Sequence, residues 1–272
     1  MQQSRSGTST ALLISKAALF CLVFTVLLVL LSFFKSFVPA QWERMAHGVV
    51  GTIAAFLTTF FFLTYDKTTF VDIGLRFEKT TLPRFFSGFV TGTVIMGLLS
   101  LSVIYASGFR METNANSNML NFLLGTLPLI PLAFMEEVAF RAYPLEVLKD
   151  KTGVRVSILV TSVLFALYHI ANGWAVQQAF LGAGAWGLLY GATAVNGRGI
   201  AMPTGMHFAA NFTTSAFGTG TDSFHLWVLK QGNGQGLENY EAGQLATLLP
   251  QVSILVLGIV AMEWVARERS VR

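Results

Sequence analysis

The chain has 272 residues, of which 53% are hydrophobic and only 12% are charged. Soluble domains carry about 25% charged residues, so this composition excludes an ordinary soluble domain and predicts a polytopic membrane protein. The net charge of +4 comes from Lys and Arg residues that flank the apolar runs. That placement is a topology signal and does not indicate a nucleic-acid-binding protein. The single cysteine, Cys21, excludes an internal disulfide and a metal site built from cysteines.

Uncharged runs recur that are long enough to cross a bilayer, which takes about 17–25 residues. We predict an all-α bundle of about eight transmembrane helices forming a single membrane-embedded domain, residues 1–272. The helices are expected near residues 17–34, 45–65, 85–106, 119–149, 156–174, 175–195, 200–217 and 245–266. Pro128 and Pro131 should bend the fourth helix or interrupt its hydrogen-bond ladder.

Small residues recur at every fourth position in two of these helices. Gly88 and Gly92 lie in the third helix, and Ala183, Gly187 and Gly191 lie in the sixth. Such spacing places the small residues on one helix face and allows another helix to approach closely. We therefore expect tight helix packing at both places.

The basic residues are distributed unevenly between the two predicted faces. An even number of spans places both termini on one side, and that side carries fourteen of the eighteen Lys and Arg residues: Arg5, Lys16, Lys67, Arg76, Lys79, Arg84, Arg141, Lys149, Lys151, Arg155, Arg198, Arg267, Arg269 and Arg272. The opposite side carries Lys35, Arg44, Arg110 and Lys230. Basic residues concentrate on the cytoplasmic side of membrane proteins, which predicts cytoplasmic termini.

Two adjacent glutamates and an arginine follow the apolar run of the predicted fourth helix. Charged groups at membrane depth are costly unless they are paired or face water, so they are candidates for function. Glu137 and Arg141 are four residues apart with the acid first, the order that favours an intrahelical ion pair. Glu136 lies about 100° further round the helix, without a charged residue four positions on. We interpret Glu137 and Arg141 as supporting residues and Glu136 as free for chemistry.

A histidine on the next helix is expected at the same depth as Glu136. The polar turn around Thr152 and Gly153 joins two consecutive helices, which should therefore run antiparallel side by side. Glu136 precedes the centre of this turn by as many residues as His169 follows it, so regular helices would bring the two side chains level. Phe165, four residues before His169, should pack beside the imidazole ring and hold its orientation, and we interpret it as a further supporting residue.

The predicted seventh helix adds His207 and Asn211, which lie on one face and both offer N–H donors. Together with Glu136 and His169 they suit hydrolysis: a general base, a partner that shares the water, and donors for a developing oxyanion. Glu136, His169 and His207 would equally form a zinc site with an open fourth position. The spacing does not choose between metal-free and zinc-bound water. A transporter or a proton relay is a further use of such a polar site.

The three motifs resemble those of a known family. Glu136-Glu137-x-x-x-Arg141, Phe165-x-x-x-His169 and His207-x-x-x-Asn211 are similar, in this order, to the motifs of the CPBP family. This family comprises the type II CAAX prenyl endopeptidases and the Abi or bacteriocin-processing membrane proteins. The resemblance covers residues 119–218, the expected catalytic core.

The resemblance implies an intramembrane endopeptidase whose cavity opens to the cytosol. By analogy Glu136 and His169 activate water, His207 and Asn211 bind the oxyanion, and Glu137 and Arg141 support the site. It also implies a glutamate-dependent reaction without a cofactor, although the family carries a metalloprotease label and zinc is the alternative. The expected partners are a peptide or protein substrate, with or without a lipid modification, and membrane lipid, but no nucleic acid.

Two other functions are weighed beside this one. The first is a non-catalytic membrane protein that gives immunity to a bacteriocin or binds a partner and keeps the motif residues for packing. The second is a transporter, which the sequence favours less because we find no discontinuous helices in repeated halves. In each case we expect an integral protein of a prokaryotic inner membrane.

Overall fold

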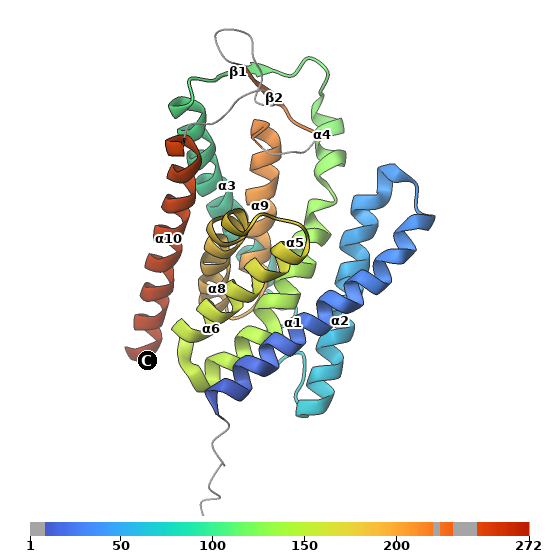
Figure 1. Cartoon of the computed structure of the whole chain (residues 1–272), viewed down its shortest axis with the longest axis vertical. Coiled ribbons are helices and arrows are strands. Elements are labelled where there is room, and N and C mark those ends of the chain that lie inside the picture. Colours follow the sequence, from blue (N-terminus) through green and yellow to red (C-terminus); the bar gives the residue numbers. More distant parts are fainter. Residues whose placement is uncertain (1–8, 220–223, 231–243, 272) are drawn as a thin grey trace, which may run out of the picture.

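Long apolar helices lie side by side in the structure, a computed structural model that describes residues 9–219, 224–230 and 244–271 (Figure 1). Two π-helical segments, η3 (Val138–Ala142) and η4 (Ala179–Gly184), interrupt them. In chain order the elements are α1 (Thr10–Ser32), η1 (Phe33–Phe37), η2 (Ala40–Trp42), α2 (Glu43–Asp66), α3 (Thr81–Ala106), β1 (Arg110–Thr113), α4 (Met119–Thr126), α5 (Leu129–Glu137), η3 (Val138–Ala142), α6 (Tyr143–Ala171), α7 (Val176–Gln178), η4 (Ala179–Gly184), α8 (Ala185–Gly197), α9 (Ala201–Phe217), β2 (Trp227–Lys230) and α10 (Gln244–Val271). The predicted all-α membrane bundle is confirmed.

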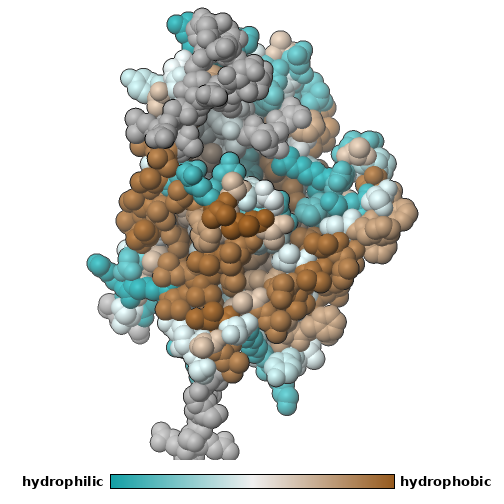
Figure 2. Space-filling view, in the orientation of Figure 1, coloured by the Kyte–Doolittle hydropathy of each residue, from teal (hydrophilic) through white to brown (hydrophobic). Residues whose placement is uncertain are grey.

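Among the described residues, 5 helical stretches are long and apolar enough to cross a membrane: Thr10–Phe37, Ala40–Asp66, Thr81–Ala106, Met119–Ala171 and Leu248–Ser270. The longest of them covers the fourth predicted helix and the fifth as far as Ala171. The backbone leaves the helical conformation between these two helices, at Gly153 (φ 81°, ψ 169°). The predicted turn is therefore present, while the number of eight spans stays a prediction. Exposed leucine, valine and phenylalanine side chains of these helices form a broad apolar band (Figure 2).

The predicted fourth helix is not regular. It is interrupted between α4 and α5 at Leu127 and Pro128, as the prolines indicated. A second irregularity, η3, was not predicted, since we expected the helix to continue regularly through Tyr143 and Pro144. Proline has no N–H to donate to the carbonyl four residues earlier, here that of Phe140, and this disrupts the α-helical ladder. The residue pair that precedes η3 is Glu136 and Glu137.

The buried core surrounds η3. Phe140 is fully buried, and its ring centroid lies 5.1 Å from that of Phe165, 5.3 Å from that of Tyr168 and 6.1 Å from that of Phe24. Helices α1 and α6 thus clamp the irregular segment between aromatic rings, and such pairs add to the free energy of burial. This packing fixes the position of the two glutamates that directly precede η3.

The predicted close packing of the third helix is confirmed, and its partner is α9. A Cβ atom added to Gly88 would lie 2.0 Å from the carbonyl oxygen of Met202, and one added to Gly92 would lie 2.5 Å from that of Met206. From the other side, a Cβ atom on Gly205 would lie 2.0 Å from the carbonyl oxygen of Phe85. The two backbones therefore touch, and this contact positions α9, the helix that carries His207.

We expect Gly88→Ala to lower the stability of the protein by about 1–3 kcal/mol, the usual cost of overpacking, because its methyl group has to displace backbone. Gly97→Ala in the same helix is the matched control, since a Cβ atom there meets nothing within 4 Å. Helix propensity makes that control neutral or stabilising by up to about 1 kcal/mol. Thermal unfolding of the purified variants in detergent checks the pair, and equal midpoints would contradict the packing argument.

Two opposite faces of the bundle are defined by polar contacts. On one face, Lys16 pairs with Asp66, and Arg155 binds Glu263 with N–O distances of 2.7 and 2.9 Å. On the same face Arg269 donates to the Val195 carbonyl at 2.6 Å. We call this the termini face, because the start of α1 and the end of α10 both lie there (Figure 1).

The opposite face carries a small antiparallel sheet, and we call it the sheet face. Strand β1 pairs with β2 from Arg110 opposite Lys230 to Thr113 opposite Trp227. The sheet was not predicted, because each strand is short and lies in a segment that we interpreted as a loop. It joins the end of α3 to the end of α9, so both helices finish at this face (Figure 1).

Candidate active site

A cavity of about 460 Å³ lies inside the bundle, and five of the predicted site residues line it: Glu136, Phe165, His169, His207 and Asn211. They come from α5, α6 and α9, so the fold brings the three separate motifs together around one cavity. Two of the predicted supporting residues, Glu137 and Arg141, do not line the cavity, and both side chains are 0% exposed. The structure thus separates the neighbouring glutamates as the helix geometry predicted.

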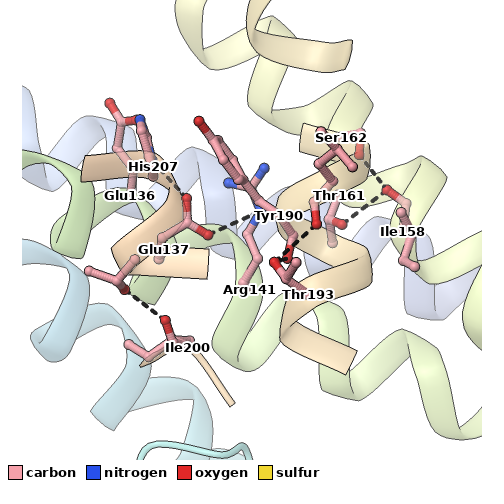
Figure 3. Close-up of polar contacts among 12 residues, drawn as sticks. Glu136, Glu137, Arg141, Ile158, Thr161, Ser162, Tyr190, Thr193, Ile200 and His207 are labelled. Carbon is pink, nitrogen blue, oxygen red and sulfur yellow. Dashed lines mark hydrogen bonds and ion pairs between the residues drawn. The ribbon is translucent and has the colours of Figure 1, made fainter. Parts of the chain in front are cut away.

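His207 lies between the two glutamates (Figure 3). Its Nδ1 atom is 2.8 Å from Oε1 of Glu137, and its Nε2 atom is 3.6 Å from Oε2 of Glu136. An ionised carboxylate only accepts hydrogen bonds, so Nδ1 carries a proton when Glu137 is charged. The ring is further held by Tyr190, which stacks on it with centroids 4.6 Å apart and an interplanar angle of 18°. Glu137 therefore orients His207, a role that the sequence did not predict.

The predicted ion pair of Glu137 and Arg141 is present, with Nε 3.5 Å from Oε2. This separation exceeds that of a normal N–H···O hydrogen bond, about 2.7–3.2 Å. The Arg141 nitrogens have no hydrogen-bond partner among the described residues. The guanidinium instead lies over the Phe165 ring at 4.2 Å and the Tyr190 ring at 5.4 Å, where the ring faces attract a cation.

Gly187 belongs to the predicted small-residue stripe and explains how the guanidinium fits. A Cβ atom added to Gly187 would lie 3.0 Å from Nη2 of Arg141 and 3.2 Å from Cα of Ser162. The small residue thus leaves space for the buried arginine as well as for close packing of α6 and α8. Any larger side chain here would compete with Arg141 for the same volume.

His169 is fixed by its own helix. Its Nδ1 atom lies 2.9 Å from the Phe165 carbonyl oxygen, and its ring packs edge-on against the Phe165 ring with centroids 4.5 Å apart. The predicted contact between the two rings is therefore confirmed. A carbonyl only accepts hydrogen bonds, so Nδ1 is protonated and the neutral ring keeps Nε2 as an acceptor. This is the tautomer that a water-binding or metal-binding imidazole needs.

Several residues of the cavity wall were missed by the sequence analysis. Trp174, Trp186 and Tyr190 all line the cavity, and the Trp174 ring lies 4.6 Å from that of His169. Arg44, from the start of α2, lines it as well. Trp186 and Tyr190 lie in an apolar helix, where aromatic residues carry no spacing signal of their own, so only the packing of α8 against α6 and α9 identifies them.

An apolar side chamber of about 210 Å³ adjoins the cavity between α3 and α10. It shares Met96, Gly182, Trp186 and Thr214 with the cavity wall, and it is otherwise lined mainly by apolar residues such as Leu99 and Ile254. The polar part of the cavity, which Glu136 lines, therefore adjoins a space that suits a hydrocarbon group.

The donor atoms do not form a metal site as arranged. Among the described residues there is no group of three or more His, Cys, Asp or Glu side chains that could hold a metal ion. His207 directs Nδ1 at Glu137, and its Nε2 atom is in ion-pair contact with Glu136. As arranged in the part of the chain that the structure describes, Glu136, His169 and His207 do not form such a group.

Comparison with known proteins identifies one family. The model of the type II CAAX prenyl endopeptidase Rce1-like family matches residues 117–213, a segment that contains all three motifs. No curated protein matches the chain. The matched family is one of proteases, and the long apolar helices make this chain an integral membrane protein. Residues 117–213 match the type II CAAX prenyl endopeptidase Rce1-like family, which confirms the resemblance that the three motifs indicated.

Proposed function

We propose that the protein is an intramembrane endopeptidase in which Glu136 activates the attacking water. The observation that carries this proposal is the placement of Glu136, which lines the same cavity as His169, His207 and Asn211, while the adjacent Glu137 is buried beneath it. One carboxylate can thus reach a substrate and the other cannot. The arrangement supports general-base hydrolysis, which needs no serine or cysteine nucleophile.

In the proposed reaction the Glu136 carboxylate takes a proton from water, and the hydroxide forms a bond with the scissile carbonyl carbon. His169 holds the same water through Nε2, because its Nδ1 proton is engaged by the Phe165 carbonyl. As the C–N bond breaks, Glu136 returns the proton to the leaving amine. Base and acid are therefore the same residue at successive steps.

His207 and Asn211 would stabilise the negative oxygen of the tetrahedral intermediate. To donate from Nε2, His207 must carry protons on both nitrogens, since Nδ1 faces Glu137 at 2.8 Å. Asn211 lies one helical turn further along α9 in the cavity wall and adds an uncharged donor.

The substrate in this proposal is a peptide or protein segment with an apolar portion or a lipid group. The side chamber between α3 and α10 supports it, because an extended substrate that places a peptide bond at Glu136 can direct a hydrocarbon group there. We place the protein in a prokaryotic inner membrane with cytoplasmic termini, and we assign it no cofactor and no nucleic-acid partner.

We expect Asn211→Ala to lower kcat by about 10²–10³ with little change in KM, the typical cost of removing one oxyanion donor. Asn121→Ala on exposed α4 is the matched control and should be unchanged. Hydrolysis of peptide libraries by the two purified variants measures kcat and KM for each.

The same assay with a strong chelator, together with elemental analysis of the purified protein, tests whether hydrolysis depends on zinc. Stoichiometric zinc whose removal and return stops and restores turnover would refute the metal-free reaction.

The non-catalytic alternative makes a different prediction for the same material. An immunity or partner-binding protein would show no hydrolysis with any peptide, and its protective effect in cells would survive Asn211→Ala and substitutions at Glu136. A transporter would move a solute across vesicle membranes without cleaving it. Either result would replace the endopeptidase proposal.

A further inference from the structure

The cavity extends in only one direction from the candidate catalytic residues, as α9 shows. This helix starts at the termini face, where Gly199 packs against Gly74, and it ends at the sheet face, where the Phe217 and Trp227 rings are 5.2 Å apart. Its cavity-lining residues are His207, Ala210, Asn211 and Thr214. None of the described residues of α9 before His207 lines this cavity, so the open space lies between His207 and the sheet face.

The helices around α9 repeat this arrangement. Helix α5 runs from the sheet face towards the termini face, and it contributes Leu129, Leu132 and Glu136 but nothing beyond Glu136. The part of α6 that follows Gly153 runs the opposite way, and it contributes Phe165 and His169 but no residue before Phe165. In η4 and α8 no residue after Tyr190 lines the cavity. In α2, Arg44 is the only cavity-lining residue among those described, and it lies at the end of α2 that is nearer the sheet face.

Towards the termini face the cavity is closed. Glu137, Arg141 and Tyr143 follow Glu136 along the chain and are 0%, 1% and 2% exposed. The large cavity at the termini face, about 430 Å³ near Arg76 and Arg84, has no described lining residue in common with the one that holds Glu136. A substrate therefore reaches Glu136 from the sheet face.

The distribution of Lys and Arg residues indicates on which side of the membrane the sheet face lies. The four basic residues outside the termini-face group, Lys35, Arg44, Arg110 and Lys230, lie in η1, at the start of α2 and in the two strands. Among the described residues, the termini face and the segments leading to it carry eleven Lys and Arg residues: Lys16, Lys67, Arg76, Lys79, Arg84, Lys149, Lys151, Arg155, Arg198, Arg267 and Arg269. Basic residues of membrane proteins concentrate on the cytoplasmic side, so the sheet face lies on the non-cytoplasmic side.

We infer that the candidate active site is reached from the non-cytoplasmic side of the membrane. The substrate class that follows, given the proposed endopeptidase function, is a peptide segment exposed at that side: the outer end of a membrane-anchored protein or an exported peptide with an apolar portion. This differs from the expectation, drawn from the family resemblance, of a cavity open to the cytosol.

Thiol labelling of the full-length protein in membranes tests this inference independently of catalysis. The native Cys21 is buried and is replaced by Ala, and single cysteines are then introduced. Gly182→Cys places a thiol in the cavity wall, where an added Cβ atom meets only Trp174, at 3.8 Å. Asn116→Cys reports the sheet face and Lys151→Cys the termini face. Thr214→Cys is a second cavity probe if Gly182→Cys does not fold.

In intact bacterial cells with a permeabilised outer layer, a small membrane-impermeant thiol reagent should label Gly182→Cys as completely as Asn116→Cys. Lys151→Cys should be labelled only after the inner membrane is opened. Labelling of the cavity cysteine together with Lys151→Cys, or its protection under both conditions, would overturn the inference. External labelling of the cavity in a protein that hydrolyses no peptide would instead refute only the proposed function.

Discussion

Glu136→Gln is expected to abolish peptide hydrolysis while the protein stays folded in the membrane. Glutamine keeps the size of the side chain and removes the base, and general acid–base groups contribute about 10²–10⁴-fold to a rate. Because Glu136 serves as base and then as acid in the proposed reaction, the loss in kcat should lie at the upper end of that range. The Glu136 side chain is 14% exposed, so its replacement leaves no buried charge without a partner.

Turnover and thermal unfolding of purified Glu136→Gln, measured beside the wild type, check this result. Glu112→Gln, at an exposed site of β1 where the carboxylate pairs with Lys230, is a control for the same chemical change outside the cavity. It should retain full activity. Near-wild-type hydrolysis by Glu136→Gln would remove this residue from the reaction and with it the proposed mechanism.

Glu137→Ala is expected to fail in a different way, by destabilising the fold. Its carboxylate contacts Nδ1 of His207 at 2.8 Å and Nε of Arg141 at 3.5 Å, and all of the Glu137 and Arg141 side-chain surface is buried. Removing one partner of a buried pair leaves an uncompensated charge and typically costs about 3–5 kcal/mol. The His207 ring also loses the group that orients it, so activity should fall even in the molecules that remain folded.

Glu136→Ala is the matched control, because it makes the same truncation at the neighbouring position. Unfolding midpoints of the two alanine variants in detergent should differ, with Glu137→Ala lower. Arg141→Met tests the same ion pair by removing the buried cation of Arg141 in place of the buried carboxylate of Glu137. Equal midpoints for Glu136→Ala and Glu137→Ala would contradict the assignment of a supporting role to Glu137.

The sequence by itself was sufficient for the membrane bundle, for the match of the three motifs to a family and for the different surroundings of the two glutamates. These features depend on local chemistry: long apolar runs need helices to satisfy their backbone in lipid, and the positions of Glu136, Glu137 and Arg141 around a helix follow from its period. The interruption at Pro128 and the packing of Phe165 on His169 follow from equally short-range rules.

Only the tertiary structure determined which residues of other elements each helix contacts. The contact of Glu137 with His207 joins residues far apart in the sequence, and the stacking of Tyr190 on His207 depends on how α8 packs against α9. The irregular segment η3, the strand pairing of β1 with β2 and the closed floor beneath Glu136 likewise arise from packing between elements. Helical spacing defines the face of a helix on which a side chain lies, but the neighbouring helices determine whether that face borders lipid, a buried ion pair or a cavity, and towards which side the cavity opens.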